Sequence, residues 1–106
     1  MDTVPIQIVR FVMKHQPNIV ECVLTDASGR QWHFLDKSAI FTEAYLDQHS
    51  AYPLPGILGC EVVREWTDKQ GRLVATIDTD RPWAISATTG ETRFDVLADH
   101  ITRVAA

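Results

Sequence analysis

One six-residue pattern, Thr-Asp-x-x-Gly-Arg, occurs twice and constrains the fold more than any other feature of this sequence. The pattern occupies residues 25–30 and again residues 67–72. In each copy the aspartate can accept backbone hydrogen bonds at the start of a turn, and the glycine can take the positive φ that a short hairpin loop requires. Strand-like runs flank both copies, so we predict two antiparallel β-hairpins.

The runs around these turns are rich in β-branched and aromatic residues, and several of them alternate between apolar and polar side chains. Val20, Cys22 and Leu24, for example, would share one face of a half-buried strand. The predicted strands cover residues 6–13, 19–25, 30–35, 57–67 and 73–78, with a last one around residues 94–96. Residues 14–18 are predicted as a loop. The segment of residues 83–86 is too short to assign firmly, and an edge strand is one option. For the C-terminal tail we predict either a turn of helix or a short strand at residues 101–104.

The stretch between the two hairpins predicts a short helix followed by a stiff connector. Thr42 can cap a helix that continues to Asp47, and Glu43 would lie near its positive end. Residues 50–56, Ser-Ala-Tyr-Pro-Leu-Pro-Gly, end this helix because a residue that precedes proline is pushed out of the helical region. The connector then leads into the long strand at residues 57–67.

These elements predict a mainly β fold: a small antiparallel barrel or rolled sheet of about six strands with one short helix in the middle. An open α+β sheet is the alternative. A chain of 106 residues with 45% hydrophobic residues can bury one core, so we predict a single domain over residues 1–106. The predicted core consists of Val20, Cys22, Leu24, Trp32, Phe34, Val62, Trp66, Ala75, Ile77 and Phe94.

Charge and hydropathy argue against two classes of partner. The net charge is −4, and acidic residues exceed basic ones in both halves, so no basic patch is available to neutralise phosphates and we expect no nucleic-acid binding. No apolar run approaches the ~20 residues of a membrane-spanning helix, and the N-terminus lacks the pattern of a signal peptide. We therefore expect a cytoplasmic protein with no membrane partner.

Cys22 and Cys60 lie in apolar strand contexts and not in a Cys-x-x-Cys pair. In a reducing compartment buried free thiols are the favoured interpretation, and a disulfide is possible if their strands are neighbours. A zinc site could combine the two thiols with His33 and one more histidine, but no two of these residues lie at a ligand-like local spacing, and His33 should face away from Trp32 and Phe34. We therefore expect neither a bound metal nor a cofactor.

The residues that could support catalysis have simpler structural interpretations. Asp78 and Asp80 could divide acid and base roles or hold a hard cation, but they could equally cap the next turn and pair with Arg81 or Arg93. Ser86 with Asp99 and His100 supplies the residue types of a hydrolase triad without a recognisable motif. We therefore predict no catalytic residues and a protein that is not an enzyme.

A cluster of aromatic residues and prolines outside the predicted strands is the best lead to a binding surface. The candidate residues are Tyr45, Tyr52, Pro53, Leu54 and Trp83. Aromatic side chains often anchor protein interfaces, and proline-rich backbone loses little entropy on binding. Acidic residues nearby in sequence would suit a basic partner protein. The competing interpretation, which we favour, is that these side chains cover the open ends of the barrel.

The repeated turn pattern, the Tyr-Pro-Leu-Pro-Gly connector, Cys60-Glu61, Trp66-x-Asp68 and Arg81-Pro82 together resemble short uncharacterised bacterial β-rich proteins. That resemblance implies no catalytic residue, because no activity is attached to the group. The size and acidity of the chain are also similar in type to bacterial immunity proteins, which bind and block a toxin. The function classes are therefore a protein-binding module, an immunity-type inhibitor of a bacterial toxin, and a small-molecule-binding β-barrel. The sequence does not fix an oligomeric state.

Overall fold

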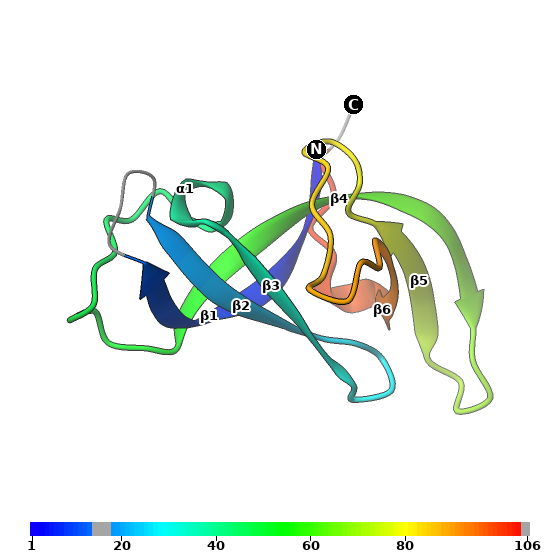
Figure 1. The fold of residues 1–106 in the computed structure, drawn as a ribbon. Helices are drawn as coiled ribbons and strands as arrows, with labels where there is room; N and C mark the ends of the chain where they lie inside the picture. The colour runs from blue at the N-terminus through cyan, green and yellow to red at the C-terminus, as the bar shows by residue number, and fades with distance from the viewer. Residues whose placement is uncertain (14–17, 105–106) are drawn as a thin grey trace.

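A computed structural model describes residues 1–13 and 18–104, which form a six-stranded antiparallel sheet curled into a half-barrel (Figure 1). The elements in chain order are β1 (Asp2–Met13), β2 (Ile19–Thr25), β3 (Gln31–Lys37), α1 (Ser38–Phe41), β4 (Leu54–Thr67), β5 (Leu73–Asp78), β6 (Arg93–Leu97) and the 3-10 turn η1 (Ala98–His100). The strand order in the sheet is β3-β2-β1-β4-β5-β6. The predicted fold class is confirmed: the protein is mainly β, with one short helix in the middle.

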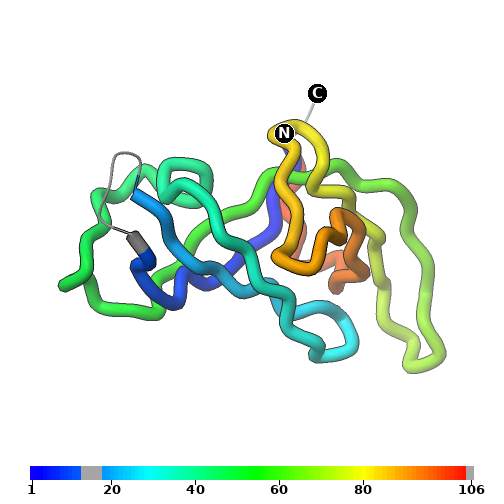
Figure 2. Tube along the Cα trace, in the orientation of Figure 1, coloured from blue at the N-terminus to red at the C-terminus, as the bar shows by residue number. Residues whose placement is uncertain are grey.

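Two long strands, β1 and β4, hold the two hairpins together. The first half of β1 pairs with the first half of β4, from Asp2 opposite Cys60 to Ile8 opposite Leu54. The second half of β1 pairs with β2, whereas the second half of β4 pairs with β5. The tube in Figure 2 shows the resulting bend, with the turn of the β2–β3 hairpin (cyan) at the bottom of the view and the turn of the β4–β5 hairpin (yellow-green) at the lower right.

Both long strands begin earlier than predicted, because each tolerates a proline near its start. Pro5 lies opposite Ile57, and Pro55 lies opposite Gln7. In an antiparallel ladder every second pair exchanges no hydrogen bonds, so a proline at such a position removes none from the β1–β4 ladder. The expected connector at residues 50–56 therefore ends sooner, and Leu54 already belongs to β4.

The two predicted turns form as expected. The Oδ1 atom of Asp26 accepts hydrogen bonds from the backbone N–H groups two and four residues later, both at 2.9 Å. Asp68 makes the same two contacts, again at 2.9 Å. Gly29 and Gly71 adopt φ values of 86° and 79°, in the region that glycine alone enters without steric cost.

The helix prediction was wrong in position. The helix spans Ser38–Phe41 and ends at Thr42, which was expected to begin it. Phe41 is fully buried, so packing of this turn against the core determines where the helix forms. The Oγ1 atom of Thr42 accepts the N–H of Ala44 at 3.1 Å, a local turn that replaces the expected cap.

The remaining connections follow the sequence less closely. Residues 83–86 form no strand and belong to the loop between β5 and β6. The tail combines both expected forms, since η1 is followed by a β-bridge between Thr102 and Thr3. The predicted loop at residues 14–18 lies, apart from Asn18, outside the described residues. No helix in the described part of the chain is both long and apolar enough to cross a membrane.

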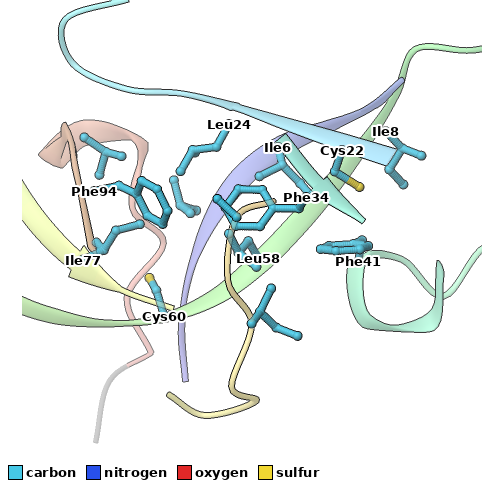
Figure 3. Packing of buried hydrophobic residues seen from close by; sticks show 14 of the residues in the cluster. Ile6, Ile8, Cys22, Leu24, Phe34, Phe41, Leu58, Cys60, Ile77 and Phe94 are labelled. Atoms are coloured by element: carbon cyan, nitrogen blue, oxygen red, sulfur yellow. The ribbon is translucent and has the colours of Figure 1, made fainter. Parts of the chain in front are cut away.

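The core fills the concave side of the curled sheet (Figure 3). Seven of the ten predicted core residues are buried: Val20, Cys22, Leu24, Phe34, Ala75, Ile77 and Phe94. Trp32 and Val62 are partly buried against this cluster. The expectation that Trp66 is buried in the core was wrong, because it is half-buried outside the cluster, with the Arg64 guanidinium 4.4 Å from its ring centre.

Candidate functional site

The most unusual feature of the sheet is an open edge on the first half of β4. β5 ends at Asp78, opposite Glu61, and does not continue beside the preceding residues of β4. Among the described residues, β1 is therefore the only strand that pairs with β4 over Leu54–Cys60. The other edge of this segment faces away from the sheet.

Hydrogen bonds of β1 show which backbone groups of β4 face this edge. The N–H and C=O of Thr3 bond to Thr102, at 3.0 and 2.9 Å, so they point away from β4. Gly59 lies directly opposite Thr3, and partners in such a pair both point outward, so the N–H and C=O of Gly59 face the open edge. The same holds two residues earlier for Ile57. Among the described residues, no hydrogen bond outside the β1 ladder reaches Ile57 or Gly59.

A groove of about 640 Å³ lies along this edge. One wall is α1 with the residues that follow it, the floor includes Pro55 and Ile57, and Met1 and Trp83 complete the lining. The side chains of Met1, Ile57 and Trp83 are 48%, 46% and 44% exposed. The groove is therefore mainly apolar and accessible.

Glycine at position 59 lets the groove wall approach β4. A methyl group on Gly59 would lie 2.8 Å from the Met1 sulfur and 3.3 Å from both the Pro82 ring and the Trp83 indole. Gly59 is buried under these side chains, so the accessible part of the edge lies at Pro55 and Ile57, which line the groove. A glycine inside a strand often marks such a close approach, and here it seats the wall that carries Trp83.

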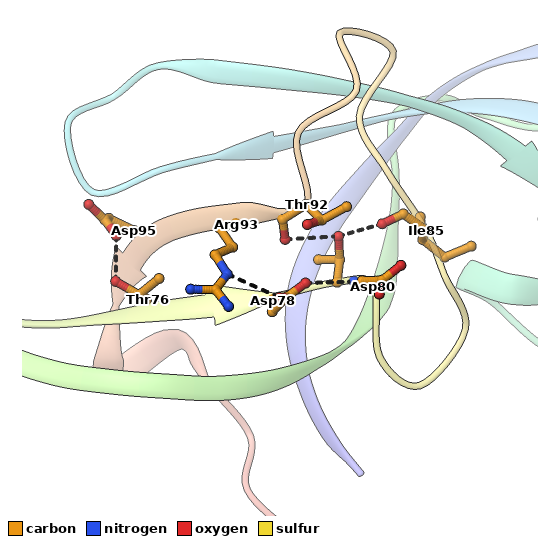
Figure 4. Close-up of polar contacts among 8 residues, drawn as sticks. Thr76, Asp78, Asp80, Ile85, Thr92, Arg93 and Asp95 are labelled. Atoms are coloured by element: carbon orange, nitrogen blue, oxygen red, sulfur yellow. Dashed lines mark hydrogen bonds and ion pairs between the residues drawn. The ribbon is translucent and has the colours of Figure 1, made fainter.

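The loop that presents Trp83 is fixed by the buried side chain of Thr79. Its two hydrogen-bond partners in this loop, Ile85 and Thr92, are labelled in Figure 4. The Thr79 hydroxyl donates to the C=O of Ile85 at 2.6 Å, and its N–H donates to the C=O of Thr92 at 2.7 Å. In return the N–H of Ile85 donates to the C=O of Thr79 at 3.0 Å. Thr79 thus closes a compact loop with Trp83 at its exposed tip.

Asp78 supports the base of this loop, as its structural interpretation predicted. Its carboxylate accepts the N–H of Asp80 at 2.9 Å and the Nε–H of Arg93 at 3.2 Å (Figure 4). The backbone hydrogen bond from Asp80 is the largest cause that lowers the pKa of Asp78 below its ordinary value, and Arg93 lowers it further. Asp78 is therefore ionised at neutral pH and engaged in holding the loop.

The five residues predicted as a binding surface do not lie together. Trp83 lines the groove at the open edge, whereas Tyr45, 82% exposed, lines a separate hollow of about 150 Å³. The hydroxyl of Tyr52 donates to the C=O of Asp47 at 2.6 Å, and its ring packs against the core. Pro53 and Leu54 line a third hollow, of about 670 Å³.

Met1 and Ile57, which line the groove, and Gly59, which lies under its wall, were not among the predicted site residues. A signal for them existed in the sequence, since Pro55 and Gly59 are residues that mark edges and close approaches when they occur in a strand. That signal could be used only if the strand was known to include Pro55, which was assigned to the connector.

The two cysteines are free and buried. Their strands, β2 and β4, are separated in the sheet by β1, so the condition for a disulfide between neighbouring strands is not met. Burial raises the pKa of Cys22 to about 12 and that of Cys60 to about 11. Both thiols are therefore protonated at neutral pH and belong to the packing of the core.

The other candidate side chains are separate or already paired. Ser86 is exposed, and no hydrogen bond among the described residues joins it to Asp99 or His100. The His33 ring is exposed and contacts the carboxylate of Glu21 at 2.7 Å, facing away from the core as predicted.

The two copies of the repeated turn face the same hollow, of about 320 Å³. Its polar groups are already engaged: Asp26 accepts the indole N–H of Trp32 at 3.0 Å, and Asp68 accepts Nε–H of Arg72 at 2.9 Å. These contacts hold the ends of the two hairpins in their turn conformations. The hollow therefore offers fewer free groups than the groove.

Comparison with protein-family models, curated proteins and solved structures gives no significant match. The functional argument therefore depends on the geometry of the groove. Its distinguishing features are the open β4 edge, the exposed apolar side chains and the wall formed by α1 and Trp83.

Proposed function

We propose that this chain is a non-enzymatic protein-binding module whose contact surface is the groove at the open edge of β4. The observation that supports it is the gathering of three exposed large apolar side chains, Met1, Ile57 and Trp83, around one groove. Single exposed apolar residues are common on protein surfaces, but a contiguous patch next to a groove is typical of an interaction site. Tryptophan is also the residue type most enriched at binding hot spots.

The acidic charge of the whole chain, together with Glu43, suits a basic partner. Glu43 is the only charged side chain that lines the described groove, and it takes part in no ion pair among the described residues. The whole chain has a net charge of −4, which adds a long-range attraction for positive charge. An immunity-type inhibitor of a bacterial toxin is one form such a module takes, and a toxin-like reading frame beside the gene would support it.

A small apolar molecule is the second candidate for the groove. Its volume of about 640 Å³ lies within the range of roughly 300–1,000 Å³ that is usual for ligand pockets. Mass spectrometry of an organic extract of the purified protein tests this alternative. A stoichiometric compound that is lost in Trp83→Ala would favour it over a partner protein.

Capture experiments with matched variants test the proposed function. The wild-type chain, Ile57→Asp and Val63→Asp would each be immobilised and exposed to lysate of the organism that encodes the chain. Val63 is an exposed apolar residue on the other half of β4, so it controls for the added charge. We expect the protein retained by the wild type to be lost with Ile57→Asp and kept with Val63→Asp. Equal retention by all three chains would show that the groove is not the contact surface.

A further inference from the structure

The open edge of β4 also suggests how a partner is held. We infer that the groove receives an extended peptide segment of the partner protein, which adds to the sheet as a strand beside Pro55 and Ile57. This inference rests on the proposed function and specifies its mode of recognition. In such strand addition, main-chain hydrogen bonds supply affinity, and pockets for alternate side chains supply specificity.

The spacing of the free backbone groups selects an extended partner. Pro55 and Ile57 are two residues apart on one strand, so their outward C=O groups lie ~6.6 Å apart. A strand presents its own donors and acceptors at the same repeat, whereas a helix satisfies its backbone internally. Pro55 has no N–H, so Ile57 supplies the accessible donor. The edge therefore matches a short extended segment.

The walls of the groove favour a single peptide over a second copy of this chain. Two copies that paired edge to edge would be related by a two-fold axis near Ile57. The C=O of Phe41, at the end of α1, lies only 3.0 Å from the position of a methyl group on Gly56, next to that axis. The two α1 turns would therefore approach each other at the axis. A lone strand lies between α1 and Trp83 without this conflict.

The lining also defines the side chains that the peptide should carry. Residues on one side of the added strand would meet Trp83, Met1 and Ile57, which favours apolar side chains at every second position. A lysine or arginine at the end near Glu43 would pair with the free carboxylate. The inferred ligand is an extended, alternately apolar segment with a basic end.

A selected peptide with single backbone changes tests the inference from the ligand side. The probe is a linear heptapeptide selected from a random phage-displayed library on the immobilised wild-type chain, with counter-selection on Ile57→Asp. N-methylation, which removes one N–H, would then be placed at each residue in turn. We expect alternate positions to lose affinity by about tenfold or more, and the intervening positions to stay within about twofold. No groove-dependent peptide, or losses without this two-residue period, would overturn the inference.

A proline substitution tests it from the protein side. Ile57→Pro removes the N–H that faces the open edge and leaves the β1 ladder intact, whereas Ile57→Val keeps both the N–H and an apolar side chain. We expect the heptapeptide to bind Ile57→Pro about tenfold more weakly than Ile57→Val. Equal affinity would mean that α1 and Trp83 merely shield the edge. If Ile57→Pro does not fold, the N-methyl series on the wild type still decides.

Two further results separate this inference from the proposed function. If capture of the cellular partner depends on Ile57 but the N-methyl series shows no period, the groove binds through side chains alone, and only the strand-addition inference fails. If capture does not depend on Ile57, the proposed function fails first. Sedimentation of the wild-type chain as a dimer that Ile57→Pro converts to a monomer would assign the edge to a second copy and overturn the peptide occupant.

Discussion

Replacing Thr79 with valine is the sharpest test of how the loop that carries Trp83 is held. The two side chains have similar shapes, so the substitution mainly exchanges the buried hydroxyl for a methyl group. The C=O of Ile85 loses the donor that lies 2.6 Å away, while the C=O of Thr92 keeps the N–H of residue 79 at 2.7 Å. The variant therefore leaves one loop acceptor without its side-chain partner.

The expected cost follows from that single orphaned group. Thr79 is fully buried, and an unsatisfied buried acceptor costs about 1–3 kcal/mol. We expect Thr79→Val to lower the free energy of unfolding by about 2 kcal/mol. For a domain of this size that corresponds to a fall in Tm of roughly 10 °C. The urea m-value should not change, because the surface exposed on unfolding is the same.

Urea unfolding followed by tryptophan fluorescence measures this cost, with Thr79→Ser as the matched control. Serine keeps the hydroxyl and removes only a methyl group, so it should cost less than about 1 kcal/mol. A Thr79→Val variant within ~0.5 kcal/mol of the wild type would refute the reasoning. So would a serine variant that is as unstable as the valine variant, because packing would then outweigh the hydrogen bond.

Three further outcomes are expected. Trp66→Ala should lower the free energy of unfolding by less than half of the ~3–5 kcal/mol expected for Phe34→Ala, because Trp66 is only half-buried. Comparable urea midpoints for the two variants would contradict the placement of Trp66. Cys22 and Cys60 should resist alkylation in the native state at pH 8 and react fully in urea, as mass spectrometry can show; rapid native labelling would contradict their burial. Burial raises the pKa of Asp26, but hydrogen bonds from an indole, a hydroxyl and two N–H groups outweigh it and lower the pKa below 3.8. Because the pKa of Asp26 is lower in the folded state than in the unfolded state, its ionised carboxylate stabilises the fold at neutral pH. The free energy of unfolding should therefore fall as the pH drops below about 4, where Asp26 becomes protonated first in the unfolded state. Urea titrations at several pH values should show a smaller fall in Asp26→Asn than in the wild type.

The hairpin turns could be predicted from sequence because their chemistry is local. Asp26 and Gly29 satisfy the turn within a few residues, and the same holds for Asp68 and Gly71. The starts of β1 and β4 could not be predicted in this way. Whether a strand tolerates Pro55 depends on which residue lies opposite it, and that register is set by a segment about fifty residues away in the chain.

The misplacement of Trp66 has an equally specific cause. Strict alternation put it on the same side as Cys60 and Val62, facing the core. The pairing of β4 with β5 shifts between Val62 and Arg64, so one extra residue is inserted into β4 at this point. Such a bulge reverses the faces of all later residues, and Trp66 therefore lies opposite Val74 on the other side of the sheet.

The candidate site could be predicted only in part. The sequence singled out Trp83, because an aromatic residue beside proline in a loop often takes part in recognition. The groove itself depends on where β5 ends relative to β4 and on the position of α1, which are properties of the assembled sheet. Tyr45, Tyr52 and Leu54 were grouped by closeness in sequence, but the structure distributes them among different surroundings.

The sharing of β1 and β4 between the two hairpins has a kinetic consequence. The β2–β3 and β4–β5 turns close short loops and can form early, but β1 meets β4 only when residues 2–8 reach residues 54–60. Closing that long loop costs entropy before its contacts are gained, so it should dominate the folding barrier. We expect substitutions at Val4 and Leu58, which pair across β1 and β4, to slow refolding. Because the two turns are already formed when this loop closes, substitutions there should also slow refolding and leave the unfolding rate little changed.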